Sequence, residues 1–134
     1  MNSEEKKNKL FKKLSEALKD RVNLLNNIHF SLINITLIEY YKDIDTLMVK
    51  LINKEIEKLY LVIFMKIDTL NLDIDKTEVR FYFYKEISAN QIKDYNVKEE
   101  LNFSDLKGNT LNEKMEYLIE KIIASYDFIQ KQLL

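Results

Sequence analysis

Both ends of the chain carry apolar residues at helical spacing. From Ser3 to Asn26, apolar positions recur every three or four residues, with lysines and glutamates between them. The same spacing returns from Leu111 onwards, where Thr110 and Glu113 have the S/T-x-x-E form of a capping box directly after Gly108. The pattern therefore predicts a long N-terminal helix and a long C-terminal helix, each about 24 residues and ~36 Å long.

Between the two helices the hydrophobic period falls from 3.6 towards 2. Residues Leu59–Ile67 and Glu78–Ile87 alternate two sets of side chains and are rich in aromatic and β-branched types, so both are predicted strands. Phe30–Tyr40 alternates in the same way and is a third predicted strand. The stretch from Ser88 to Lys107 is polar, and we expect a short helix in it that begins at Ser88 and Gln91.

Residues Ile44–Lys58 fit two patterns. Read with period 2, they form a strand with Leu47, Val49 and Leu51 on one side; read with period 3.6, they form a helical stripe. We favour the strand because the preceding YYKDID is typical of a turn, and a meander then needs only short connections. The expected fold is α+β: a single domain over residues 1–134, in which an antiparallel meander of about four strands is flanked by the two helices (α-β-β-β-β-α).

The two aromatic strands are apolar or aromatic on both parities, whereas a half-solvated sheet alternates apolar and polar side chains. Helices that divide between the two faces would bury both. Helices that share one face would leave a patch of several hundred Å² bare, and patches of that size usually bind something. We select as candidate partner-binding residues the side chains that would form this patch, with Arg80 as the directional polar contact: Tyr60, Phe64, Arg80, Tyr82 and Tyr84.

The composition removes most catalytic and metal-centred chemistries from consideration. The chain has no cysteine, proline or tryptophan, one glycine (Gly108) and one histidine (His29). A zinc site needs several Cys or His ligands, a nucleophilic triad needs a placed imidazole, and a phosphate-cradling loop needs glycines. We therefore expect no catalytic residue, no metal and no cofactor, and interpret His29 as a boundary histidine with one satisfied nitrogen.

One acidic segment carries a motif-like pattern. Asp68, Asp73, Asp75 and Thr77 lie close together, and LDIDKT matches the DxDxT pattern of aspartyl-phosphate hydrolases. That motif needs a parallel sheet and further Lys and Asp motifs, which an antiparallel chain of this size does not supply. Carboxylates of this kind can hold a hard divalent cation, but a solvated acidic turn is the expected structure.

The charge balance argues against nucleic acid and the hydropathy against a membrane. Lys and Arg number 21 and Asp and Glu 22, a formal net charge of −1, whereas a duplex binder normally has a basic excess. The longest apolar run, Leu59–Met65, is too short to span a bilayer. With a charged opening and no cysteine, a cytoplasmic location is expected.

These observations favour a small non-enzymatic protein that presents a surface to a protein partner, as adaptors, inhibitors, immunity proteins and secretion chaperones do. A homodimer through the C-terminal helix is a further hypothesis, because Ile123, Phe128 and Leu134 fall partly off its main stripe.

Two alternatives stay open. The first is a small-ligand or nucleotide-binding protein, or an enzyme, whose pocket lies between the sheet and the helices, with Arg80, Tyr82, Tyr84 and His29 as its polar groups. The second and weaker one is single-stranded nucleic-acid binding on the aromatic face, which the balancing acids disfavour.

Overall fold

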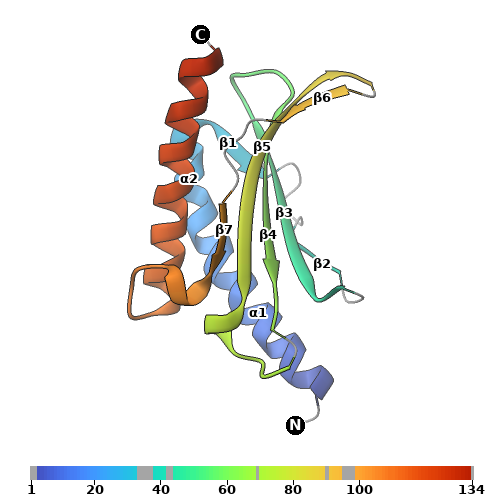
Figure 1. The fold of residues 1–134 in the computed structure, drawn as a ribbon, viewed down its shortest axis with the longest axis vertical. Coiled ribbons are helices and arrows are strands. Elements are labelled where there is room, and N and C mark those ends of the chain that lie inside the picture. The colour runs from blue at the N-terminus through green and yellow to red at the C-terminus, as the bar shows by residue number, and fades with distance from the viewer. Residues whose placement is uncertain are drawn as a thin grey trace.

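The computed structural model describes residues 3–32, 38–41, 44–68, 70–89, 91–94 and 99–133. These residues form an antiparallel sheet packed against two long helices, α1 (Ser3–Val22) and α2 (Leu111–Leu133), so the predicted α+β class is confirmed (Figure 1). Three short 3₁₀ segments are η1 (Asn23–Ile28), η3 (Ile74–Lys76) and η4 (Phe103–Asp105). The strands are β1 (Phe30–Leu32), β2 (Ile38–Tyr41), β3 (Thr46–Asn53), β4 (Leu59–Lys66), β5 (Glu78–Ser88), β6 (Gln91–Asp94) and β7 (Glu99–Asn102).

The sheet has a continuous centre and divided edges. Strands β3, β4 and β5 lie side by side, and each pair of neighbours is antiparallel. On one edge β1 and β2 both pair with β3, and on the other edge β6 and β7 both pair with β5. The seven strands exceed the predicted four or so because the edges are built from short pieces, and short edge strands limit unwanted pairing with other chains.

The ambiguous central segment is a strand, as we favoured, and the helical alternative is wrong. Strand β3 spans Thr46–Asn53, with Leu47, Val49 and Leu51 fully buried on one side. It pairs with β4 along one edge and with β1 and β2 along the other. A segment with partners on both edges gains two ladders of backbone hydrogen bonds, which outweighs its equally good helical spacing.

The short helix predicted to begin at Ser88 and Gln91 is wrong. Strand β5 continues to Ser88, and the polar residues after it supply the edge strands β6 and β7. Exposed edge strands carry few apolar side chains, so their sequence shows no clear period. Of the predicted strand Phe30–Tyr40, the structure shows β1 and the start of β2, and residues 33–37 lie outside the described part of the chain.

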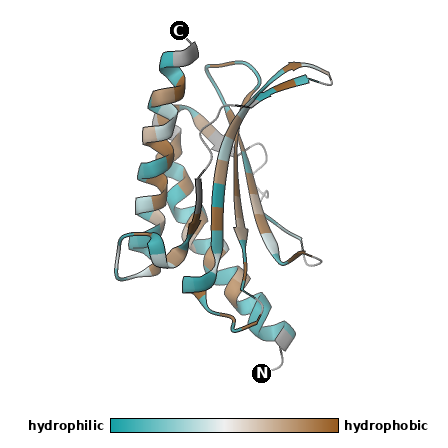
Figure 2. Ribbon diagram, in the orientation of Figure 1, coloured by the Kyte–Doolittle hydropathy of each residue, from teal (hydrophilic) through white to brown (hydrophobic). Residues whose placement is uncertain are grey.

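Both helices pack on the same face of the sheet (Figure 1). The buried core joins the apolar stripes of α1 and α2 to one parity of the three central strands, as the hydropathy colours of Figure 2 also show. On β4 that parity is Leu59, Leu61, Ile63 and Met65, whereas Val62 does not belong to the core cluster. The other parity of β3, β4 and β5 therefore points away from both helices.

The start of α2 is built as the sequence predicts, with one shift. The Thr110 hydroxyl accepts a hydrogen bond from the Glu113 backbone N–H at 3.1 Å, while the Glu113 carboxylate accepts from the N–H of Asn109, one residue before the expected partner. Gly108 has φ 134°, and a Cβ there would lie 2.6 Å from the Glu113 Cβ, so only glycine fits. At the other end, α1 stops at Val22, earlier than predicted, and the chain continues as η1.

Candidate binding surface

The five candidate residues lie on one face of the sheet, the face that points away from both helices. Antiparallel pairing sets Tyr60 opposite Tyr84, and Phe64 opposite Arg80. Tyr82 stands opposite Val62, between these two pairs. We call this surface the outer face, formed by the alternate side chains of β3, β4 and β5: Met48, Lys50, Ile52, Tyr60, Val62, Phe64, Arg80, Tyr82 and Tyr84.

The aromatic side chains of the outer face stack on one another. Tyr60 and Tyr84 have ring centroids 5.1 Å apart with their planes at 22°. Phe64 and Tyr82 are 5.9 Å apart at the same angle, and Tyr82 lies 6.0 Å from Tyr84. The four rings form a connected row that crosses β4 and β5 diagonally. Such contacts fix ring orientation and add to the hydrophobic contribution of each ring.

Two cations lie over these rings. The Lys50 ammonium is 4.6 Å from the centroid of Tyr60 and 5.4 Å from that of Tyr84. The Arg80 guanidinium carbon is 4.9 Å from the centroid of Phe64. All three distances are within the range at which a ring quadrupole attracts a cation.

The protonation of Lys50 is secured by its neighbours. Partial burial works to lower the pKa of Lys50, but the hydrogen bond to Tyr84 and the nearby oxygens of Tyr84, Tyr60 and Glu86 outweigh it, so this pKa is raised. Lys50 is therefore a fixed positive charge on the outer face at neutral pH.

The candidate residues are neither core nor freely solvated. Tyr60, Phe64, Tyr82 and Tyr84 are partly buried, and Arg80 is exposed. This differs from the opposite parity, where Phe81 and Phe83 are at most 1% exposed. The rings therefore form a pre-assembled and partly buried aromatic cluster around Val62, which is 3% exposed.

A groove of about 480 Å³ opens at the end of the outer face where Glu78 begins β5. We call it the end groove. One register row across β3, β4, β5 and β7 supplies four of its side chains, and the row two residues further along the strands supplies Phe64 and Arg80. The four in the first row are Thr46, Lys66, Glu78 and Asn102.

The end groove was not predicted, because it depends on strand register. Lys66 and Asn102 are about 36 positions apart in the chain and become neighbours of Glu78 only when β4 and β7 pair with β5. Asp105, which follows β7 in η4, completes the groove. No local spacing of residues in the sequence predicts this arrangement.

The small-ligand alternative expects a pocket between the sheet and the helices, but the end groove lies at the end of the outer face. Of the polar groups named for it, Arg80 lines the end groove, but Tyr82, Tyr84 and His29 do not. His29 has φ 65° at the junction of η1 and β1, and its Nε2 lies 3.0 Å from Glu55 Oε1. This contact agrees with the interpretation of His29 as a boundary residue.

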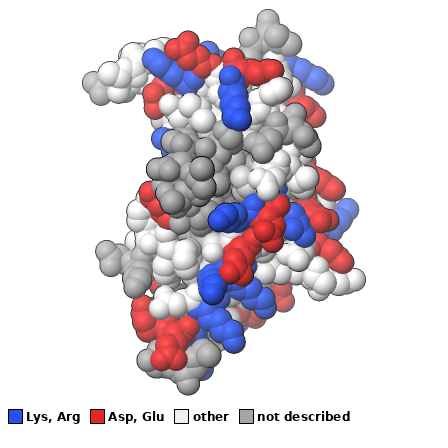
Figure 3. Space-filling model, turned by 180° about the vertical axis from the view of Figure 1, so that it is seen from behind, with Lys and Arg blue, Asp and Glu red and all other residues white. Residues whose placement is uncertain are grey.

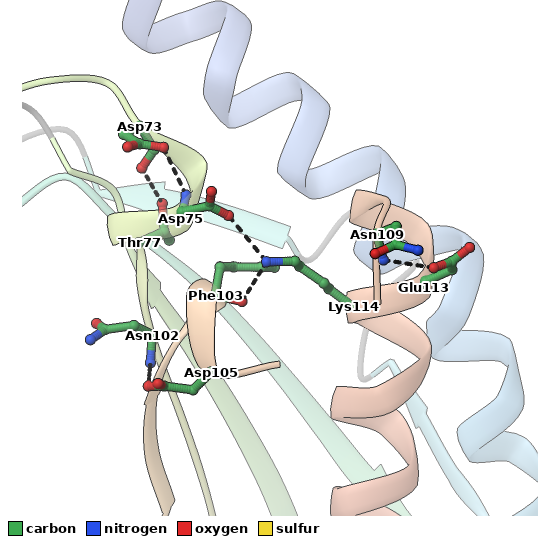
Figure 4. A network of polar contacts seen from close by, with 9 residues as sticks. All are labelled: Asp73, Asp75, Thr77, Asn102, Phe103, Asp105, Asn109, Glu113 and Lys114. Carbon is green, nitrogen blue, oxygen red and sulfur yellow. Dashed lines mark hydrogen bonds and ion pairs between the residues drawn. The ribbon is translucent and has the colours of Figure 1, made fainter. Parts of the chain in front are cut away.

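The acidic segment forms a capped turn that is tied to α2 (Figure 4). The Asp73 carboxylate accepts a hydrogen bond from the Asp75 N–H at 3.0 Å, which begins η3. The Asp75 carboxylate in turn accepts from the Lys114 ammonium at 3.1 Å, and the same ammonium donates to the Phe103 carbonyl at 2.9 Å. Within the described ranges, no group of three or more His, Cys, Asp or Glu residues is placed to hold a metal ion.

The three residues that suggested a homodimer have different environments. Ile123 is partly buried against the core, whereas Phe128 is 56% exposed on α2. Leu134 lies outside the described residues. Phe128 is therefore the described residue of the three that is accessible to a second copy.

Comparison of the chain with protein-family models, with curated proteins and with solved structures finds no match. Among the helices in the described ranges, none is long and apolar enough to cross a membrane. Function is inferred below from the contacts of the chain itself.

Proposed function

We propose that this chain is a small, non-enzymatic binding protein of the cytoplasm that holds a protein partner on its outer face. The observation that carries the proposal is the placement of α1 and α2 on the opposite face of the sheet, so neither of these two described helices covers the four stacked rings. The contact residues in this proposal are Tyr60, Phe64, Arg80, Tyr82 and Tyr84.

The chemistry of the outer face suits a protein interface. Tyr and Arg are enriched among the residues that carry most of the binding energy in such interfaces. The stacked rings lose little side-chain freedom when a partner docks, because their neighbours already hold them. Arg80, held over Phe64, adds a directional donor for a carboxylate or a backbone carbonyl of the partner.

The distribution of charge favours a protein over nucleic acid as the partner. Single-stranded nucleic acid needs a positive groove beside the aromatic platform. The same parity of β3, β4 and β5 carries three basic residues and two acids, Lys50, Lys66, Arg80, Glu78 and Glu86. In the view of Figure 3, acidic and basic side chains likewise lie next to one another over the surface.

Self-association through α2 is a separate part of the proposal, supported by the exposure of Phe128. Light scattering coupled to size-exclusion chromatography should give twice the monomer mass of 16.1 kDa, and the Phe128→Ser variant should give the monomer mass. A monomeric mass for the unaltered chain at tens of micromolar removes this part and leaves the outer-face contact untouched.

The outer-face contact is tested by affinity capture from an extract of the native organism, with quantitative mass spectrometry of what is retained. The variant chain carries Tyr60→Ala and Tyr84→Ala. The control is Leu70→Ala, which removes an 88% exposed apolar side chain in the loop between β4 and β5. The unaltered chain and the control should retain the same protein, and the double variant should retain at least about tenfold less of it.

Circular dichroism is measured first to establish that both variants are folded. The proposal is contradicted if the folded double variant retains as much of the captured protein as the control does. This holds whether both variants match the unaltered chain or both fall below it by the same factor.

A further inference from the structure

The end groove differs in chemistry from the aromatic rings beside it, because it carries charges of both signs. Lys66 on β4 and Arg80 on β5 supply positive groups, and Glu78 on β5 and Asp105 in η4 supply negative ones. In the part of the chain that the structure describes, no ion pair joins Lys66, Glu78 or Arg80 to another residue. Lys66 and Glu78 therefore line the groove without an ion-pair partner among the described residues, and Arg80 contacts the Phe64 ring.

The positive and negative groups of the groove are interleaved, because Glu78 and Arg80 lie two residues apart on β5. Lys66 stands directly opposite Glu78, on neighbouring strands whose backbones lie about 4.8 Å apart. Asp105 lies beyond Glu78, on the side of β7, where its carboxylate also accepts a hydrogen bond from the Asn102 N–H at 3.0 Å. Glu78 therefore neighbours both Lys66 and Arg80, and Asp105 adds a second acid on the side of β7.

Arg80 is held in an orientation that suits a carboxylate. Its guanidinium carbon lies 4.9 Å from the centre of the Phe64 ring, and the side chain is exposed towards the groove. A guanidinium supported on a ring in this way can offer two parallel N–H groups to a carboxylate. An ammonium of a ligand would instead be attracted by Glu78 and Asp105.

Three apolar residues also line the groove, beside the uncharged polar residues Thr46 and Asn102. Phe64, Val79 and Leu101 line it together with the charged groups. A volume of about 480 Å³ is within the range of small-molecule sites in proteins. Phosphates and other polyanions fit this lining poorly, because Glu78 and Asp105 would repel them.

We propose that the end groove binds a compact zwitterion, a small molecule with a carboxylate and an ammonium group on an apolar body, as in a free amino acid or a dipeptide. The carboxylate contacts Lys66 and Arg80, the ammonium contacts Glu78 and Asp105, and the apolar part lies on Phe64. The site shares Phe64 and Arg80 with the protein contact proposed above, but it extends to Lys66, Glu78 and Asp105 and does not use the tyrosines.

The test is titration of the ¹⁵N-labelled chain with L-leucine and with leucyl-leucine, followed by NMR. At least one of the two should shift the amides of Lys66, Glu78 and Arg80 in a saturable manner, and the comparison shows whether a free amino acid or a dipeptide is preferred. N-acetyl-leucine and leucinamide lack one charge each, and each should bind at least about tenfold more weakly than leucine.

Two variants test which side chain of the groove contacts each charged group of the ligand. Glu78→Gln should reduce the difference between leucine and N-acetyl-leucine, and Arg80→Gln should reduce the difference between leucine and leucinamide. Lys54→Gln, in the exposed turn after β3, should change neither difference. The proposal is overturned if neither probe binds the unaltered chain at millimolar concentration, or if blocked and unblocked probes bind equally. Both of those outcomes are measured on the unaltered chain, so they do not depend on the folding of a variant.

Discussion

The Asn53 side-chain amide donates a hydrogen bond to the Tyr126 hydroxyl across 3.0 Å in the buried interior. Asn53 ends β3 and Tyr126 lies on α2, so this bond ties the last helix to the turn between β3 and β4. The same Asn53 side chain uses its oxygen to accept from the backbone N–H groups of Glu55 and Ile56, which fixes the turn itself. One amide thus connects local turn geometry to the packing of a helix 73 residues later.

This arrangement predicts a graded loss of stability. Tyr126→Phe keeps the ring but leaves the Asn53 amide without its closest acceptor, and should lower the free energy of unfolding by about 1–2 kcal/mol. Asn53→Ala also removes the two turn hydrogen bonds and should cost about 2–4 kcal/mol. Urea denaturation of both variants measures the two values. Equal losses for the two variants would contradict the role of the turn.

The positive φ at Lys58 predicts that replacing this residue by glycine stabilises the protein. It is an exposed residue with φ 62° in the turn that leads into β4, a conformation that costs a residue with a side chain about 1 kcal/mol. Lys58→Gly keeps the backbone carbonyl that accepts from the Glu86 N–H and should raise the free energy of unfolding by about 0.5–1 kcal/mol. Lys54→Gly, in the same turn but without a positive φ, is the matched control and should not stabilise. A loss of stability in Lys58→Gly would show that its side chain contributes more than the strain costs.

The two bonds of the Lys114 ammonium predict a loss of stability when α2 is no longer bonded to the acidic turn. Its ammonium is bonded to both Asp75 and the Phe103 carbonyl (Figure 4). Lys114→Met retains the apolar stem and loses both bonds, so the free energy of unfolding should fall by about 1–2 kcal/mol. Asp75→Asn removes only the exposed ion pair and should cost less than about 1 kcal/mol. A larger loss in Asp75→Asn than in Lys114→Met would contradict the importance of the carbonyl contact.

The raised pKa of Tyr40 predicts a loss of stability at alkaline pH. Burial and the hydrogen bond to Asp45 raise the pKa of Tyr40 to about 12 in the folded protein, against about 10 when unfolded. Below the unfolded value both states keep the phenolic proton and this contribution is complete. Between the two values the unfolded chain releases its proton while the folded chain retains it, so stability falls as pH rises. Unfolding measured from about pH 9 to about pH 12 should therefore show a shallower decline in Tyr40→Phe than in the unaltered chain.

The long elements could be predicted from local pattern because each carries its own period. The apolar stripes of α1 and α2 and the Thr110 cap need no distant partner to be recognised. Alternation in β4 and β5 likewise placed Tyr60 and Tyr84 on one face, and the register then sets them opposite each other. Whether the helices divide between the faces was open in the sequence, because their stripes do not encode which face they cover.

The remaining features depend on contacts between distant residues. Strands β6 and β7 are polar edge strands that exist through their pairing with β5, so local spacing suggested a short helix in their place. The end groove needs Lys66, Glu78 and Asn102 to meet across three strands. In both cases register, which follows from the whole sheet, decides the outcome.

The claim on which the proposed function rests is that the outer face is a surface for contact and not a second core. Denaturant unfolding of the Tyr82→Ala/Tyr84→Ala double variant tests it most directly, with Phe81→Ala/Phe83→Ala on the opposite parity as the matched control. We expect the outer-face variant to lose about 2–4 kcal/mol and to keep a cooperative transition. The core variant should lose more than about 6 kcal/mol and fail to fold. An outer-face variant that unfolds like the core variant would contradict the account.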